Sequence, residues 1–341
     1  MKLGTWLAAA GLLLAAGLHL APAAQADTLS AVKERGTLKC GVNVGLAGFS
    51  APDDKGQWSG FDADFCRAVA AAVLADPAKV TFVPLTAEAR FSALAKGDVD
   101  VLVRNSTWTL SREAELKLQF PAITYYDGQG FMLRDARKIT SALELDGTKV
   151  CAPAGTTSAL NVVDFFSANH MKLELVTLPS IDELIKAYDS GACDVLTTDV
   201  SQLFALRLRL AKPIDHIVLP DVISKEPLGP AVRQGDDAWL NVVKWTAFAL
   251  VNAEELGIST ATVDQALKSD KPAVKRFVGL DGSYGEQLGL TKDWAVRIVR
   301  SVGNYGEVFE RNVGSDSKLG IPRGINQLWS AGGIQYAPPV R

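Results

Sequence analysis

Short strand-like segments alternate with helical stripes along most of the chain. Lys39–Val44 and Val80–Leu85 have the length and composition of buried strands. Between them, Phe61–Leu74 carries apolar side chains at helical spacing along one face. It also carries acidic side chains in its first turn, where the helix dipole favours them. Strands that alternate with helices of this length predict parallel sheets built from β-α-β units, so the pattern predicts an α/β protein.

The pattern repeats at a constant offset of 94 residues. Thr86–Gly97 is predicted to be a capped helix that ends at glycine and leads into a strand, and Ser180–Gly191 has the same features. The strands before these helices, Val80–Leu85 and Glu174–Leu178, keep the offset. Any two β-α-β units share part of this pattern. A constant offset across strand, cap, helix and stop nevertheless favours two similar lobes.

Polar clusters follow the two equivalent strands. Arg104-Asn105-Ser106-Thr107 follows the first strand, and Thr197-Thr198-Asp199 follows the second. Ligands of open α/β sheets gather beyond the carboxyl ends of the strands. Two lobes that each present such a cluster define a cleft between them.

Two short segments that contain glycine, Gly128–Arg134 and Leu228–Gln234, are the predicted crossings between the lobes. They predict a discontinuous first lobe and a continuous second lobe, each with a mostly parallel sheet flanked by helices. The predicted boundaries are 27–130 plus 234–341 for the first lobe, with a C-terminal extension after about Thr291, and 131–233 for the second.

The N-terminus has the pattern of a secretory signal peptide. Lys2 precedes the apolar run Leu3–Leu20, and Ala24 and Ala26 form a small-x-small cleavage pattern just before Asp27. A retained signal anchor is the alternative, and the well-formed cleavage site disfavours it. No cysteine lies at that site, and no later apolar stretch approaches the roughly 20 residues that a bilayer requires. We therefore expect residues 1–26 to be removed and the mature chain to be exported and soluble.

Charge and composition exclude several classes of function. Without Lys2, the chain carries 34 Lys and Arg residues against 38 Asp and Glu residues, a net charge of −4, which does not suggest nucleic acid or an anionic membrane as a partner. His170 and His216 are not at metal-ligand spacing, so neither a metal nor a cofactor is expected. An even number of cysteines in an exported protein favours disulfides, although four cysteines allow three connectivities. These cysteines are Cys40, Cys66, Cys151 and Cys193.

The polar clusters contain the groups that a free amino acid needs. Its α-carboxylate suits the planar fork of an arginine, and Arg112 lies just after the first cluster. Its α-ammonium needs a carboxylate, and Asp199 ends the second cluster. Gly155-Thr156-Thr157-Ser158 lies between a predicted strand, Lys149–Ala152, and a helix that begins near Ala159, which makes it a further anion site.

Five motifs in chain order give the sequence a resemblance to a known family. The chain resembles the family 3 periplasmic solute-binding proteins of polar amino acid ABC transporters, and within them the general L-amino-acid-binding subfamily. Each motif is weak alone, but the ordered set is specific and extends over essentially the whole mature chain. The motifs are Gly60-Phe61-Asp62-Ala63-Asp64, Gly97-Asp98-Val99-Asp100, Thr107-x-Thr-x-x-Arg112, Gly155-Thr156-Thr157-Ser158 and Cys193-Asp194-Val195-Leu196-Thr197-Thr198-Asp199.

The resemblance implies a two-lobed type II periplasmic binding protein fold that closes around its ligand. The implied ligand is an L-amino acid, with broad specificity that favours polar or acidic side chains. The implied partners are the membrane permease and ATPase subunits of an ABC transporter. The resemblance further implies a periplasmic monomer that is not an enzyme and has no cofactor.

Roles for individual residues follow from the same resemblance. Arg112 would hold the α-carboxylate with Thr107 and the backbone N–H of Thr157, beside Ser158. The ammonium would be bound by Asp199 and the carbonyl of Asn105. Phe49 or Leu46 would form an apolar wall, and Arg90 matches a position that contacts the ligand side chain in some acidic-amino-acid binders. The family often has glycine at the positions of Asn105 and Thr157, so both side chains are expected to reshape the pocket.

Each role has a simpler alternative. Arg112 could be a surface helix residue, Asp199 could simply cap the helix that starts near Ser201, and Arg90 could lie with Glu88 on a solvated face. An enzyme on the same fold, a periplasmic dehydratase of the cyclohexadienyl or arogenate type, is the competing function. It would need an acid with a raised pKa in the cleft. No glutamate lies in the strand-end clusters, and Glu113 follows Arg112 on a helix.

The lobe assignment favours one disulfide connectivity, although the spacing of the cysteines alone does not determine it. Cys40 with Cys66, and Cys151 with Cys193, would each join a strand to an element of the same lobe. Bonds between lobes would obstruct closure. We therefore expect these two pairs.

Overall fold

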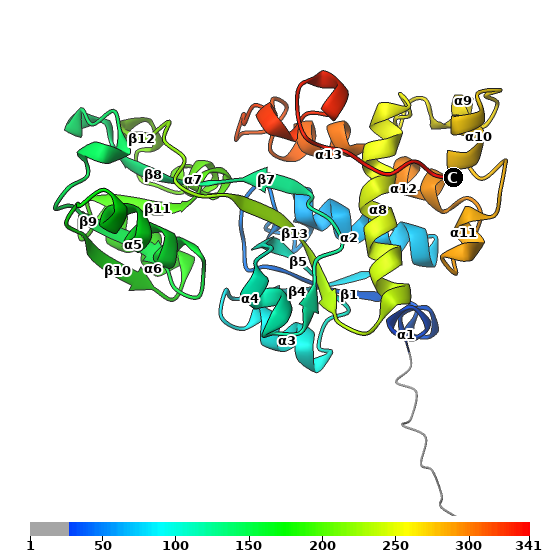
Figure 1. Ribbon diagram of the computed structural model, residues 1–341, viewed down its shortest axis with the longest axis horizontal. Helices are drawn as coiled ribbons and strands as arrows, with labels where there is room; N and C mark the ends of the chain where they lie inside the picture. The colour runs from blue at the N-terminus through cyan, green and yellow to red at the C-terminus, as the bar shows by residue number, and fades with distance from the viewer. Residues whose placement is uncertain (1–26) are drawn as a thin grey trace, which may run out of the picture.

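The computed structural model describes residues 27–341, which fold into two α/β lobes (Figure 1). The predicted signal peptide, residues 1–26, lies outside the described residues. No helix within residues 27–341 combines the length and the apolar character needed to cross a membrane.

The first lobe contains a mixed sheet in which the parallel strands lie at one side. β1 pairs in parallel with β4 and β5, whereas β13 runs antiparallel to β5, β6 and β7. The sheet order is β4-β1-β5-β13-β6, and β7 pairs with β13. Its strands are β1 Leu38–Asn43, β4 Val80–Leu85, β5 Val101–Thr107, β6 Leu118–Gln119, β7 Tyr125–Asp127 and β13 Glu226–Arg233, and a separate hairpin joins β2 Ala51–Pro52 to β3 Trp58–Ser59.

The second lobe repeats this arrangement. Its sheet order is β10-β9-β11-β8-β12, with β9 parallel to β10 and β11, and with β8 antiparallel to β11 and β12. The two parallel triplets, β4-β1-β5 and β10-β9-β11, therefore have the same order, as the sequence repeat predicts. The elements are β8 Gln129–Arg134, β9 Lys149–Pro153, β10 Glu174–Leu178, β11 Val195–Asp199, β12 His216–Val218, α5 Ser158–Ala168, α6 Ile181–Asp189 and α7 Val200–Arg207.

Local sequence signals explain most element boundaries. The helix predicted over Phe61–Leu74 coincides with α2, which follows Gly60 and carries Asp62 and Asp64 in its first turn. Ser180 caps α6, since its hydroxyl accepts from the backbone N–H of Glu183 at 3.2 Å. The helix predicted to begin at Thr86 instead begins at Arg90, after a turn in which the Thr86 hydroxyl accepts from the N–H of Ala89 at 3.2 Å.

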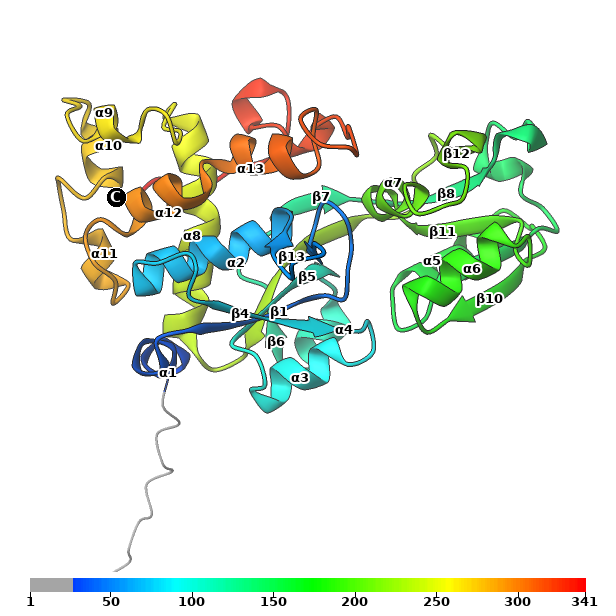
Figure 2. The same cartoon turned by 180° about the vertical axis from the view of Figure 1, so that it is seen from behind.

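Helices α9, α10 and α11 lie at the end of the first lobe that faces away from the second, whereas α13 lies nearer to the second lobe (Figure 2). Helix α12 packs on α2 and α8, and its buried face joins the large hydrophobic core of the molecule. The helices of this lobe are α1 Thr28–Arg35, α2 Phe61–Leu74, α3 Arg90–Lys96, α4 Leu110–Ala114, α8 Asp237–Glu255, α9 Val263–Ala266, α10 Pro272–Phe277, α11 Tyr284–Gln287, α12 Trp294–Val302 and α13 Tyr305–Asn312.

The chain passes between the sheets at two places. The first lies at Gly128, between β7 of the first sheet and β8 of the second. The predicted boundaries at 131 and 233 remain a prediction. Because β13 (226–233) pairs with strands of the first sheet, we propose that the return crossing lies just before Glu226.

Both disulfides stay within one lobe. Cys40 of β1 is bonded to Cys66 of α2, with Cα atoms 6.1 Å apart. Cys151 of β9 is bonded to Cys193, which lies just before β11, with Cα atoms 5.8 Å apart. This is the expected pairing, and it leaves the two lobes without a covalent cross-link beyond the crossings themselves.

Candidate functional site

Residues from both lobes surround a small cavity between them. The carboxyl ends of β5 and β11 and the turn between β9 and α5 supply most of its polar side chains, and seven of the nine predicted ligand-binding residues are among them. The cavity measures about 30 Å³, the space of a single water molecule, so a ligand requires the lobes to separate and re-close. Its lining is Ala87, Arg90, Arg104, Asn105, Thr107, Arg112, Pro153, Thr156, Thr157, Ser158, Ile181, Thr198, Asp199 and Gln202.

Arg112 supplies a buried cation from the first lobe. It lies on α4, which Thr109 caps, and its Nη1 donates to the carbonyl of Thr107 at 2.7 Å. Its guanidinium also lies over the ring of Phe91, 4.9 Å from the centroid. Burial lowers the pKa of Arg112, and the nearby carboxylates of Glu226 and Asp199 oppose that shift. Among residues 27–341 it forms no salt bridge, so its remaining N–H groups are available to an anion.

Asp199 supplies a buried anion from the second lobe. It ends β11 and occupies the N-cap position of α7, but its side chain makes no capping hydrogen bond. No donor within the described part of the chain reaches its carboxylate, although the residue is only 6% exposed. Burial raises the pKa of Asp199, and the neighbouring carboxylates of Asp127 and Glu226 raise it further. A cationic ligand group would satisfy this carboxylate.

Asn105, near the end of β5 and facing the second lobe, has an unusual backbone conformation. Its φ is +29°, in a region that favours glycine and tolerates asparagine, which explains why glycine fits this position in the family. Its backbone N–H donates to Asp62 at 2.9 Å, and its side chain donates to Gln202 of the second lobe at 3.4 Å. Burial raises the pKa of Asp62 to about 6, against the opposing effects of the Asn105 N–H and of Arg104.

Thr107 and Thr157 are held by a carboxylate that sequence analysis missed. Both hydroxyls donate to Oε2 of Glu226, and Oε1 accepts from Asn161 at 2.7 Å and from Ser224 at 2.8 Å. Four donors fill the lone-pair sites of a carboxylate. Glu226 is buried at the start of β13, far from these partners in sequence, and no local pattern marks it.

Two further arginines lie beside Arg112. Arg90 is buried on α3, where its Nη2 approaches the carbonyl of Gly155 at 3.5 Å and its Nε has no partner. Arg104 is buried on β5 and donates through Nε to the carbonyl of Leu85 at 2.8 Å. Burial and the other arginines lower the pKa of Arg90. Burial lowers the pKa of Arg104 to about 10. Arg104 was overlooked as a ligand candidate, although a charged residue within a buried strand is a visible signal.

The remaining predicted residues lie in different surroundings. Ser158 begins α5 in the cavity wall, and its hydroxyl lies 3.4 Å from that of Thr198. Leu46 and Phe49, predicted as an apolar wall, are instead buried in the hydrophobic core and do not line the cavity. The ring of Phe49 packs edge-on against Tyr125, with centroids 5.5 Å apart.

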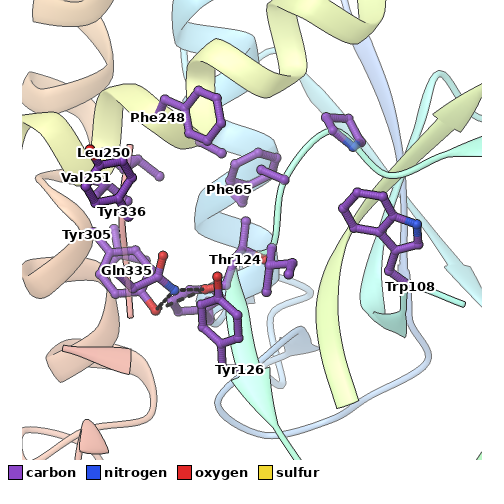
Figure 3. A pocket seen from close by; sticks show the side chains of 16 residues that line it. Phe65, Trp108, Thr124, Tyr126, Phe248, Leu250, Val251, Tyr305, Gln335 and Tyr336 are labelled. Atoms are coloured by element: carbon purple, nitrogen blue, oxygen red, sulfur yellow. Dashed lines mark hydrogen bonds between the residues drawn. The ribbon is translucent and has the colours of Figure 1, made fainter. Parts of the chain in front are cut away.

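A second cavity, of about 200 Å³, lies within the first lobe (Figure 3). Its lining is apolar and aromatic, with Phe65 and Phe248 among the side chains around it. Its polar groups bond to one another: the Tyr305 hydroxyl donates to the carbonyl of Thr124, and Gln335 donates to the Tyr305 oxygen, both at 3.0 Å. No charged side chain lines it, so the polar cavity between the lobes is the candidate ligand site.

A cleft between two lobes with free charges of both signs is the arrangement of a solute-binding protein. The sequence profile of the bacterial extracellular solute-binding proteins, family 3, matches residues 38–257. The chain belongs to this family.

Individual relatives match nearly the whole chain. The general L-amino acid-binding periplasmic protein AapJ of Rhizobium johnstonii is 55% identical over 94% of this chain and 95% of its own length. The glutamate/glutamine/aspartate/asparagine-binding protein BztA of Rhodobacter capsulatus is 51% identical over 94% of this chain and 96% of its own. A solved periplasmic binding protein from Brucella ovis with glutathione bound is 56% identical, with a TM-score of 0.92, and the match covers 93% of this chain and all of that one.

Proposed function

We propose that this chain captures L-amino acids in the periplasm and delivers them to a membrane ABC transporter. The juxtaposition of Arg112 and Asp199 carries this function. Arg112 offers free guanidinium N–H groups from the first lobe, and Asp199 offers a carboxylate without donors from the second. An α-amino acid has the two complementary charges on one carbon, so it satisfies both groups at once.

Acidic ligands fit the charge of the cleft best. Arg90, Arg104 and Arg112 are all buried, and none forms a salt bridge with a carboxylate of residues 27–341. A zwitterion with a neutral side chain adds no net charge, whereas a second ligand carboxylate compensates one of these arginines. Broad specificity with a preference for polar and acidic side chains follows. The names of BztA and of the glutathione-bound relative agree with this preference, since glutathione also carries two carboxylates and one ammonium.

A dehydratase would need an acid free for proton transfer in this cleft, and the aspartate that lines it, Asp199, is instead the proposed partner of the ligand ammonium, while no glutamate is free for that role. Glu88 is exposed, and the Glu113 carboxylate accepts from the indole of Trp108 at 2.8 Å. Glu226 is buried, but its four hydrogen-bond donors hold it as a carboxylate acceptor rather than a proton donor. Binding without chemistry is therefore the function that the site supports.

The partners and location follow from the family and the relatives. AapJ and the Brucella ovis protein are periplasmic by name, and AapJ and BztA carry amino-acid binding in their names. We infer that residues 1–26 direct export and are removed. We also infer that the mature chain acts as a monomer that docks on the permease and ATPase subunits of the transporter.

Titration calorimetry on the mature chain, residues 27–341, tests this function. L-Glutamate, L-glutamine, L-alanine and glutathione form the ligand panel. The D-enantiomers and the α-esters are the matched controls, because each misplaces or removes one charged group. We expect binding of the L-amino acids and none of the esters. Equal binding of an ester and its parent acid would contradict the assignment of Arg112, and no heat with any ligand would contradict the function.

A further inference from the structure

Helix α7 begins at the ammonium side of the cleft with an unusual cap. Asp199 stands at the N-cap position, where an aspartate ordinarily accepts from the N–H groups of the first turn. Its side chain makes no such bond. The helix is Val200–Arg207, and its first N–H groups need acceptors from elsewhere.

Asp127 supplies that acceptor from the other side of the chain crossing. It ends β7, in the first sheet, and its carboxylate accepts from the backbone N–H of Ser201 at 3.3 Å and from the Ser201 hydroxyl. The backbone assists, because Val200 N–H donates to the carbonyl of Gly128 at 2.8 Å, and Gly128 N–H donates to Asp127 at 2.9 Å. The N–H groups of Val200 and Ser201 are therefore satisfied without the Asp199 side chain.

The register of the sheet places these two aspartates at one edge. Asp199 lies directly opposite Gln129 of β8, and Asp127 precedes Gln129 by two residues. After burial, the nearby Asp127 carboxylate is the largest cause that raises the pKa of Asp199. Two aspartates could therefore accept from the N-terminus of α7, and Asp127 is the one whose side chain does so.

We propose that Asp127 is a positioning residue for ligand recognition: by capping α7, it keeps the Asp199 carboxylate free to accept the ligand ammonium. This rests on the proposed function, in which Asp199 receives that ammonium. Without Asp127, the nearest acceptor for the Ser201 N–H is Asp199 itself, which rotates into its N-cap role and leaves the cleft. The protein then loses its recognition of the ammonium and not of the rest of the ligand.

The test compares two probes that differ in that group alone. L-Glutamate and (S)-2-hydroxyglutarate share both carboxylates, and a hydroxyl replaces the ammonium in the second. We expect the wild-type protein to prefer L-glutamate by at least 100-fold, and Asp127→Ala to reduce this preference to less than tenfold. Asp127→Asn keeps an acceptor oxygen for Ser201 and should retain most of the preference. Asp146→Ala is the matched control, because Asp146 also accepts a backbone N–H in the second lobe, from Lys172 at 2.6 Å, but lies outside the cleft.

A double-mutant cycle separates positioning from a general structural role. If Asp127 acts through Asp199, then Asp127→Ala adds no further loss of L-glutamate affinity to Asp199→Ala. An equal weakening of both probes by Asp127→Ala, or additive losses in the cycle, would overturn the proposal. If Asp127→Ala does not fold, Ser201→Ala removes one of the two bonded donors and should reduce the preference partially. An unchanged preference would then overturn the proposal. Failure of the wild-type protein to bind L-glutamate contradicts the proposed function instead.

Discussion

Thr107 of the first lobe and Thr157 of the second donate their hydroxyl hydrogens to the same atom, Oε2 of Glu226. A hydroxyl has one hydrogen to donate. While Glu226 holds both hydrogens, each threonine presents lone pairs to the cleft, and the carboxylate of a ligand must be bound by Arg112 and backbone N–H groups. Glu226 thereby links the two lobes through one acceptor atom, next to the predicted position of the ligand carboxylate.

Removal of this acceptor should cost stability. Glu226→Ala leaves the buried hydroxyl of Thr107 and the partly buried donors of Thr157, Asn161 and Ser224 without their partner, and we expect a loss of about 3 kcal/mol in the free energy of unfolding. Chemical denaturation measures it. Glu174→Gln is the control, since it weakens a solvent-exposed ion pair with Lys149 worth less than about 1 kcal/mol. A Glu226→Ala protein as stable as the control would show that the network contributes little.

Arg112→Ala should leave the fold intact and reduce affinity for every L-amino acid. A ligand carboxylate would lose a charge-assisted, bidentate partner, at a cost of about 2–5 kcal/mol, so the dissociation constant should rise at least 100-fold. Calorimetry gives the affinity, and circular dichroism checks the fold. Arg137→Ala, at a half-exposed ion pair with Asp194, provides the comparison and should bind as the wild type does. Near-normal affinity of Arg112→Ala would reject the assignment.

Arg90 is expected to select the ligand side chain. It is buried in the cavity wall with an unpartnered Nε, so a second carboxylate on the ligand gives it a partner. Arg90→Ala should weaken L-glutamate by about tenfold or more relative to L-alanine. Competition between the two ligands measures this ratio, with the exposed Arg209→Ala as control. Equal losses for both ligands would mean that Arg90 only supports the fold.

Affinity should fall as the pH is lowered. Asp199 must be ionised to accept an ammonium, and burial, with Asp127 and Glu226 nearby, raises its pKa. As the pH is lowered from 8, the ligand therefore competes with a proton at a higher pH than it would at an ordinary aspartate, and the dissociation constant of L-glutamate should rise, by up to tenfold per pH unit below that pKa. Calorimetry across this range measures it. A flat profile would place the ammonium elsewhere.

In the ligand-free protein, the contribution of Asp127 to the free energy of unfolding should increase as the pH is lowered, whereas the ligand affinity falls. Burial raises the pKa of Asp127 to about 6, above its value of about 3.9 in the unfolded chain, so the folded protein holds this proton more strongly. The stabilisation is complete below about pH 4 and is lost as the pH rises through about 6. Relative to Asp127→Asn, the wild-type protein should therefore gain stability between pH 7 and pH 5. Equal pH slopes in denaturation would contradict this.

Ligand should close the lobes. Two of the hydrogen bonds that cross between the lobes beside the cavity are long, 3.5 Å from Arg90 to Gly155 and 3.4 Å from Asn105 to Gln202. Shorter bonds across the lobes, 2.9 Å from Thr157 and 2.7 Å from Asn161, go to Glu226, and a ligand held by Arg112 and Asp199 adds to them. A shift from mostly open to mostly closed requires about 5.5 kcal/mol of differential affinity. Solution scattering should show a smaller radius of gyration with saturating L-glutamate, and little change for Asp199→Ala. An unchanged wild-type profile would reject bridging of the lobes by the ligand.

Local patterns were sufficient for most of the fold and for part of the site. The periodicity of Phe61–Leu74 and the constant offset between β4 and β10 predict elements that the structure contains, because these signals depend on neighbours in sequence. The cluster with Asn105 and Thr107, and the cluster with Asp199, follow from strand ends and come together at one cavity.

The site residues that the sequence analysis did not predict make their contacts with residues far away in the sequence. Glu226 meets Thr107 across 119 positions of sequence, and Asp127 meets Ser201 across 74. No local periodicity records such contacts. Phe49 is a different case, since an apolar side chain after a strand suits a pocket wall and a core equally well. Phe49 packs against Tyr125 in the structure, and its role toward a ligand stays a prediction.

The position of β13 governs the order in which the molecule can be assembled. This strand lies between β5 and β6 in the first sheet, yet it is reached only after the whole second sheet has been traversed. During synthesis or passage through a membrane channel, the segment from Gln129 to Val218 contains every strand of its own sheet. The first sheet, in contrast, cannot be completed until residues 226–233, which form β13, have been synthesised. The first lobe therefore remains incomplete until late in synthesis, which is compatible with the proposed export of the chain before it folds.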